Sequence, residues 1–148
     1  SDVCSSDLAT LTTQIYEILT LHGNNVGSSA INTINGINYV DNRTLSIPTG
    51  SVTTLFSMDS APGAGTFVTS SIQYIRITNI TDNNIPIKLM VSSSTEAMSY
   101  LITTGSSYML STSKMTGSLS GLSFDDIKSV KVSPSGSSGS IEYFIATT

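Results

Sequence analysis

The sequence contains few of the residues that most often perform chemistry. Its 148 residues include one cysteine, one histidine and no tryptophan, and only 11% of them are charged. A single cysteine excludes an internal disulfide and a zinc site built from several thiolates. The net charge is −4, and the basic residues are scattered, at Arg43, Arg76, Lys88, Lys114, Lys128 and Lys131. Because a surface that follows a phosphate backbone needs clustered Lys and Arg, we expect no nucleic-acid partner.

Long hydrophobic runs are also missing. No apolar segment approaches the roughly 18 to 20 residues that cross a bilayer as a helix, and the first residues lack the basic and apolar pattern of a secretory signal. We therefore expect a soluble chain with no membrane contact and no export signal of its own. Apolar residues make up 39% of the chain, which is too many for an intrinsically disordered segment.

The first eight residues differ in origin from the rest of the chain. Ser1 to Leu8 resembles the in-frame translation of a short-read sequencing adapter, a scar found in reading frames assembled from environmental DNA. We treat residues 1–8 as non-native and expect one domain over residues 9–148, a length that suits a single core. Without this segment the net charge is −2 and no cysteine remains, since Cys4 lies within it.

Ser and Thr are abundant, with 28 and 20 copies. They alternate with Ile, Val, Leu, Tyr and Phe, and turn residues such as Gly, Asn and Pro separate the alternating segments at short intervals. This pattern is typical of half-buried strands in an all-β antiparallel sandwich, either jelly-roll-like or immunoglobulin-like. The clearest expected strands are 51–58, 71–80, 85–92, 97–103, 106–111, 127–133 and 140–147.

The expected strand 85–92 has a clear apolar face. Ile85, Ile87, Leu89 and Val91 alternate with polar residues, and Pro86 has no amide proton to donate, so it should lie on an edge or at a strand start. We expect this strand to pair with the strand at 71–80 as a central hairpin, through the turn at 82–84.

A second hairpin is predicted at Asn35-Gly36, which separates the segments 31–34 and 37–40. Asn-Gly is the dipeptide that a type I′ turn prefers.

Two segments allow a helix. Residues 11–21 carry apolar residues at both helical and strand spacing. We favour the strand, because Thr12, Thr13 and Thr20 suit strands better than helices. Residues 123–127 fit one helical turn capped by Ser123.

Catalytic motifs are weak. His22 lies next to a Gly-Asn-Asn turn, and a surface or turn role is the simpler interpretation. The segment 117–121 has the glycine spacing of a nucleophile elbow but places Leu119 at the nucleophile position. Asp125 and Asp126 are adjacent, so their side chains diverge on a strand or a helix and do not form an acid–base pair. We expect no catalytic residues.

Ligand-binding motifs are equally incomplete. The segment 63–68 begins as a dinucleotide fingerprint but has Val68 in place of the third glycine. Residues 82–84 lack the spaced carboxylates of a calcium loop, although calcium at this turn stays open. Asn42 and Asn79 begin glycosylation sequons. In a chain this rich in Asn and Thr, such sequons are expected by chance. We expect no metal and no cofactor. The remaining candidates are tyrosines, which could stack on sugars or fill the core, at Tyr16, Tyr39, Tyr74, Tyr100, Tyr108 and Tyr143.

Several segments together resemble small virion-associated proteins of marine tailed phages. They are Tyr74-Ile75-Arg76-Ile77-Thr78-Asn79-Ile80-Thr81, 85–91, Tyr100-Leu101-Ile102, Gly105-Ser106-Ser107-Tyr108, Phe124-Asp125-Asp126-Ile127 and Ile141-Glu142-Tyr143-Phe144-Ile145-Ala146-Thr147-Thr148. The resemblance implies a non-enzymatic β-sandwich located in the virion, which decorates the capsid or forms part of a tail or fibre. It also implies other virion proteins as partners and a homo-oligomer such as a trimer.

Three other functions stay open. A carbohydrate- or receptor-binding module would need exposed tyrosines beside Asn and Asp, and its partner would be a host-surface glycan. A bacterial surface or pilus-like subunit would need an export signal, which is not seen here but which the adapter junction could have removed. An enzyme would need His22 beside a carboxylate and a serine in a cleft.

Overall fold

The computed structural model describes residues 8–59, 66–82, 84–112, 116–117 and 125–148. Strands dominate this part of the chain, and its helical content is one 3₁₀ turn, η1 (Thr69–Ser71). The expected all-β, antiparallel class is confirmed. The chain divides into two compact units, a hairpin unit (residues 1–38) and a sandwich unit (residues 39–148).

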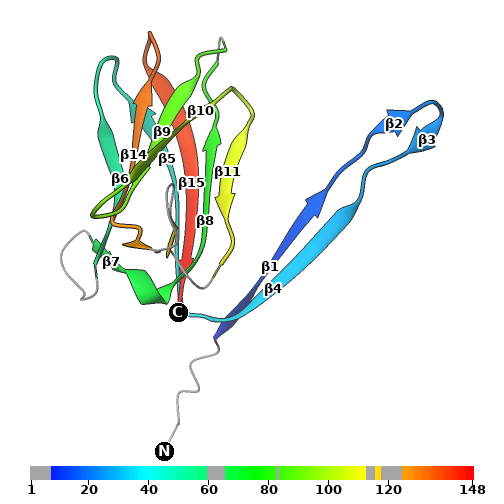
Figure 1. Ribbon diagram of the computed structural model, residues 1–148, viewed down its shortest axis with the longest axis horizontal. Helices are drawn as coiled ribbons and strands as arrows, with labels where there is room; N and C mark the ends of the chain where they lie inside the picture. The colour runs from blue at the N-terminus through cyan, green and yellow to red at the C-terminus, as the bar shows by residue number, and fades with distance from the viewer. Residues whose placement is uncertain (1–7, 60–65, 83, 113–115, 118–124) are drawn as a thin grey trace, which may run out of the picture. The chain divides into compact units, whose positions relative to one another are not determined.

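Two sheets form the sandwich unit, and Figure 1 shows them as two layers. The first has the strand order β11-β8-β15-β5, with bounds Ser107–Leu110, Ile72–Asn79, Gly139–Thr147 and Tyr39–Ile47. The second has the order β10-β9-β14-β6-β7, with bounds Ala97–Ile102, Ile87–Ser92, Ser129–Pro134, Thr53–Asp59 and Thr66–Val68. All neighbours pair antiparallel except β6 and β7, which are parallel.

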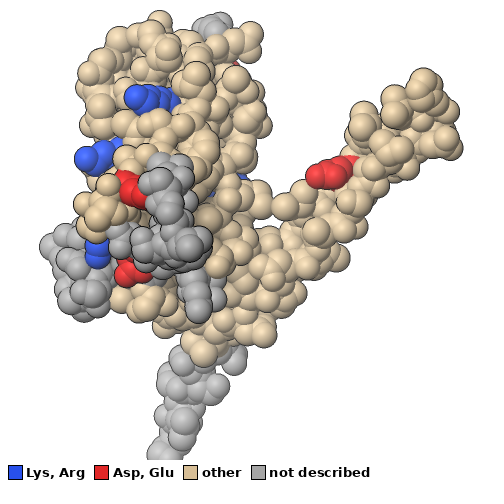
Figure 2. All heavy atoms as spheres, in the orientation of Figure 1, with Lys and Arg blue, Asp and Glu red and all other residues tan. Residues whose placement is uncertain are grey.

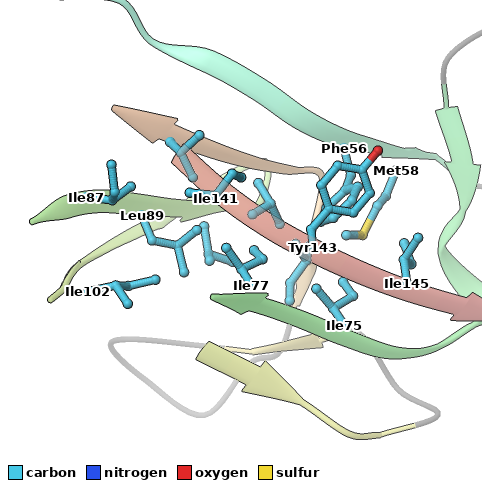
Figure 3. Close-up of a cluster of buried hydrophobic side chains, with 14 of the residues drawn as sticks. Phe56, Met58, Ile75, Ile77, Ile87, Leu89, Ile102, Ile141, Tyr143 and Ile145 are labelled. Atoms are coloured by element: carbon cyan, nitrogen blue, oxygen red, sulfur yellow. The ribbon is translucent and has the colours of Figure 1, made fainter. Parts of the chain in front are cut away.

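The core lies between the two sheets and consists mainly of branched aliphatic side chains. Alternate residues of each strand point inward, as the period of two requires. Figure 3 shows Ile75 and Ile77 of β8 facing Ile87 and Leu89 of β9 across this interior, and all four are at most 1% exposed. Close packing of this kind makes the sandwich a rigid frame for whatever lies on its surface.

Seven strands of the two sandwich sheets match the predicted segments to within about two residues, whereas β5 and β7 were not among the predicted strands. The alternation in 85–92 is confirmed, since Ile87, Leu89 and Val91 are buried while Lys88 is exposed. Pro86 immediately precedes β9, at a strand start as expected, and its carbonyl accepts a hydrogen bond from the Ser135 amide at 2.9 Å.

The predicted pairing of 71–80 with 85–92 is wrong. β8 and β9 are consecutive in the chain, but they belong to different sheets. The connection turns a corner, and Asn79 holds that corner together. Its Nδ2 donates to the carbonyls of Ile85 (2.9 Å) and Ile102 (2.8 Å), while its Oδ1 accepts from the amide of Thr81 (2.9 Å). The two apolar faces therefore meet across the core and do not lie side by side.

The hairpin unit is one long two-stranded ribbon. Its main strands, β1 (Ala9–Tyr16) and β4 (Ser29–Ile37), pair antiparallel, and β2 (Thr20–Leu21) and β3 (Asn24–Asn25) continue them to the turn (Figure 1). Backbone bonds from Glu17 to Ser28 and from Val26 to Leu19, both 2.8 Å, join the two parts in the same register. The preference for strand over helix in residues 11–21 is confirmed.

The hairpin turns at His22 and Gly23, whose φ angles are 50° and 82°. Two successive positive φ values are the signature of a two-residue type I′ turn, and histidine adopts this conformation more readily than most residues. The turn predicted at Asn35-Gly36 is wrong. Gly36 has φ 76° and lies inside β4, where the register shifts opposite Thr10. Asn-Gly serves here as a bulge, the other common use of a positive-φ glycine in a strand.

The helical turn predicted at 123–127 is not found in the described residues. Asp125–Asp126 form a short strand, β13, which pairs with β12 (Thr116–Gly117), and Ser123 lies outside the described residues. None of the described segments is a helix of the length and apolarity needed to span a membrane.

Candidate functional site

A hollow opens between the two sheets on the sandwich unit, where each sheet ends in an edge strand. β5 closes one sheet and β7 closes the other, with β15 and β6 next to them. The hollow has a volume of about 480 Å³, and its lining residues are Tyr39, Asp41, Arg43, Leu55, Phe67, Val68 and Tyr143.

Asp41 organises the polar side of the hollow. Asp41 and Arg43 are two residues apart on β5, so a strand places both on the same face. The carboxylate of Asp41 accepts a hydrogen bond from Arg43 Nε at 2.8 Å and another from the Tyr143 hydroxyl at 3.0 Å. The Asp41 side chain is only 14% exposed, whereas that of Arg43 is 61% exposed. Asp41 is thus held in place from two sides, and part of the guanidinium still faces water.

This arrangement shifts the acid–base behaviour of Tyr143. Burial, followed by the hydrogen bond to Asp41, raises the pKa of the Tyr143 phenol from 10.0 to about 12. Asp41 also raises the pKa of Arg43 above its ordinary value, chiefly through their hydrogen bond. Tyr143 therefore stays neutral, and Arg43 stays charged, throughout the physiological range.

Aromatic rings form the apolar side of the hollow. Phe56 makes edge contacts with Tyr143 (ring centroids 5.0 Å apart) and with Phe67 (6.1 Å), and Phe67 contacts Tyr39 at 6.3 Å. Such edge-to-face pairs are typical of stable aromatic clusters. Tyr39 is 50% exposed, so its ring borders both the cluster and the solvent.

The described lining of the hollow combines charged and aromatic groups. Its lining residues include no serine, cysteine or histidine, so a hydroxyl or thiol nucleophile with an imidazole base cannot be assembled from them. The carboxylate of Asp41 is already engaged on both oxygens. The groups that remain for a ligand are the half-exposed Tyr39 ring and the outer part of the Arg43 guanidinium.

The other chemical candidates are not part of this hollow. His22 is exposed at the hairpin turn, in the other unit. Asp126 is exposed on β13. Most of the segments 117–121 and 63–68 falls outside the described residues, but the end of the latter is strand β7, which supplies Phe67 and Val68 to the hollow. Asp82 is exposed, and no group of three potential metal ligands occurs among the residues that the structure describes.

The two sequon asparagines have opposite environments. Asn79 is completely buried and its amide is engaged at the corner described above, whereas Asn42 is exposed on β5. The tyrosines are also divided. Tyr74 and Tyr143 are each 5% exposed, Tyr108 is half-buried, and Tyr16, Tyr39 and Tyr100 are exposed. Sequence reasoning named Tyr39 and Tyr143 but did not connect them with Asp41, although the two-residue spacing of Asp41 and Arg43 carried that signal.

Comparison with known proteins supplies no relative. The chain matches no protein-family model, no curated protein and no solved structure.

Proposed function

We propose that this protein is a non-enzymatic structural component of a phage particle, which decorates the capsid or forms part of a tail or fibre. The sequence resemblance to virion-associated proteins of marine tailed phages suggests this role. The observation that carries it is the hairpin unit, whose strands pair only with one another among the described residues and which exposes seven large apolar side chains between Ile15 and Ile31. An exposed apolar surface of this extent is typical of a protein that functions in contact with others.

The sandwich unit fits the same role. Every buried side-chain nitrogen and oxygen atom among the described residues has a hydrogen-bond partner, so the sandwich has no unsatisfied polar group in its core that would need a cofactor or substrate. A rigid sandwich with a Ser- and Thr-rich surface can hold a fixed position among neighbours without any chemistry of its own.

Immunogold electron microscopy tests this role directly. Antibodies against the purified protein should label tailed phage particles concentrated from seawater, at one recurrent position on each particle. Labelling of bacterial surfaces in place of particles would contradict the proposal and would favour the surface-subunit alternative. The neighbouring genes provide an independent test. If the proposal is right, genes for capsid, portal or tail proteins should lie next to the gene for this protein.

A second candidate function is glycan or receptor binding at the hollow. The half-exposed Tyr39 ring beside the Arg43 guanidinium favours it, since aromatic rings stack on sugar faces and a guanidinium donates to hydroxyl or carboxylate oxygens. A glycan array provides the test. Binding that disappears in Tyr39→Ala but persists in Tyr100→Ala, whose ring is also exposed, would place the ligand in the hollow. An array without hits removes this candidate and leaves the structural role untouched.

A further inference from the structure

The hollow between β5 and β7 offers a ligand one well-exposed charged group. Asp41 is already occupied, because one of its carboxylate oxygens accepts from Arg43 Nε and the other accepts from the Tyr143 hydroxyl. The Asp41 side chain is only 14% exposed, whereas that of Arg43 is 61% exposed. The Nη1 and Nη2 atoms of Arg43 make no hydrogen bond to the residues that the structure describes. A ligand in the hollow therefore meets the outer end of a guanidinium and little of the carboxylate.

Asp41 also fixes the direction of this guanidinium. The group is planar and carries its N–H donors in a rigid fork. Because Nε is bonded to Asp41 at 2.8 Å, the plane is held, and Nη1 and Nη2 form a pair of donors at its far end. A pair of donors that is already held in place loses less entropy when a ligand binds.

Donors in this position select a ligand that supplies acceptors. An ionised carboxylate has only acceptors, and its two oxygens match two guanidinium donors in a bidentate pair. A hydroxyl is a poorer match, because it must also donate its own proton, and Asp41 already accepts on both oxygens. Charge-assisted hydrogen bonds are also about twice as strong as neutral ones. The polar side of the hollow therefore favours a carboxylate over a neutral group.

The apolar side of the hollow suits a ring. Tyr39 is 50% exposed, and its ring lies against Phe67 at a centroid distance of 6.3 Å. Leu55 and Val68 add aliphatic surface to the same lining. An exposed aromatic ring can stack on the C–H face of a sugar, and the volume of about 480 Å³ is typical of small-ligand sites.

The distribution of positive charge limits how many charges the ligand carries. Arg43 is the only cation among the lining residues. Figure 2 shows the Lys and Arg groups of the sandwich unit lying apart from one another. A densely charged polyanion needs a row of cations, so a ligand that presents a single carboxylate fits this surface better.

We propose that the hollow binds a sugar acid, with its carboxylate on the Nη atoms of Arg43 and its ring against Tyr39. The inference rests on the glycan-binding candidate given above and names the ligand class for it. It does not involve the structural role in the particle.

Matched pairs of ligands test the class of sugar. The probes are the methyl glycosides of galacturonic, glucuronic and N-acetylneuraminic acid, each compared with its methyl ester, which keeps the shape and removes the charge. NMR titration of the full chain should show at least one acid binding about tenfold more tightly than its ester. Equal binding of acid and ester would overturn the inference but keep the glycan candidate. No binding of any probe would overturn both.

A carboxylate without a sugar tests the contribution of the ring. N-acetylphenylalanine has a carboxylate and an apolar ring, as a peptide carboxyl terminus can. It should bind at least about tenfold more weakly than the best sugar acid. Binding as tight as that of the sugar acid would overturn the inference, because the site would then recognise a carboxyl terminus.

Variants of Arg43 and Tyr39 separate the two contacts. Arg43→Gln should weaken binding of the acid by about ten- to a hundredfold and leave binding of the ester unchanged, which also shows that the hollow is still formed. Tyr39→Ala should weaken the acid and the ester equally.

The matched control for the lost charge is Lys88→Gln, which removes one positive charge at an exposed position of β9 outside the lining of the hollow. It should keep the wild-type affinity for both ligands. A preference for the acid that survives in Arg43→Gln, or that is lost equally in Lys88→Gln, would overturn the assignment of the carboxylate to Arg43.

Discussion

The two units of this protein use the same sequence pattern with opposite results. In the sandwich unit, strands with alternating apolar residues face each other across a core in which Ile77 and Leu89 are fully buried. In the hairpin unit, the same alternation leaves Ile18 and Ile31 exposed, and only Ile37 is buried among residues 8–38. The difference teaches that alternation specifies a strand but not its burial. A second layer has to be present before an apolar face becomes a core.

Charge follows the same division. Every Lys and Arg of the chain lies in the sandwich unit, where Arg76 Nη2 and Glu142 Oε1 form an ion pair at 2.7 Å across neighbouring strands. The hairpin has no such pair, because Glu17 is its only charged residue apart from those in residues 1–7. A soluble domain normally surrounds its core with charges, and the hairpin lacks both the core and the charges.

The largest expected effect contrasts a core leucine with a hairpin isoleucine. Leu89→Ala should lower the free energy of unfolding of the sandwich by about 2–5 kcal/mol, since it removes a fully buried side chain and leaves a cavity. Ile31→Ala, at a 65% exposed position, should change it by less than about 0.5 kcal/mol. Urea unfolding of dilute protein, followed through tyrosine absorbance, measures both. Equal losses would mean that the two units unfold as one body.

The next effect concerns the corner between the sheets. Asn79→Ala should lower the free energy of unfolding by about 2–3 kcal/mol, because it leaves two buried carbonyls and one amide without their hydrogen-bond partner. Asn42→Ala is the control, since Asn42 starts the other sequon but is exposed on β5, and it should be nearly neutral. The same urea titration measures both variants. An unchanged free energy of unfolding in Asn79→Ala would show that the corner is held by packing alone.

The smallest expected effect is at the hollow. Near neutral pH, Tyr143→Phe should lower the free energy of unfolding by about 1 kcal/mol, which is the contribution of one hydrogen bond. In the unfolded chain the phenol loses its proton near pH 10.0, whereas in the folded protein its pKa is raised to about 12. The stability that this shift contributes is thus fully present below about pH 10 and is lost as the pH rises toward 12.

Stability measured from pH 8 to pH 12 tests this window. The advantage of the wild type over Tyr143→Phe should shrink across it, although the remaining tyrosines titrate in both proteins. An advantage that stays constant up to pH 12 would mean that Asp41 does not hold the neutral phenol.

The candidate site was only partly predictable. Tyr39 and Tyr143 could be named as aromatic candidates, and Asp41 and Arg43 share a face by their spacing alone. Their meeting depends on β5 pairing with β15, two strands that lie at opposite ends of the sandwich unit in sequence. No local pattern specifies that pairing. The same limit explains the error at Asn35-Gly36, because a positive-φ dipeptide suits a hairpin turn and a bulge equally well.

The amino-acid sequence by itself determined that this chain is built from strands, approximately where seven of the sandwich strands begin and end, and which residues of a strand share a face. These properties depend on a period of two and on turn residues, which are local. The tertiary structure alone decided that β8 and β9 lie in opposite sheets, that Asn79 holds the corner, and that one alternating segment is covered while another is exposed. Those outcomes depend on contacts between residues far apart in the chain, where many pairings satisfy the same local pattern and only the packing of the whole core selects one.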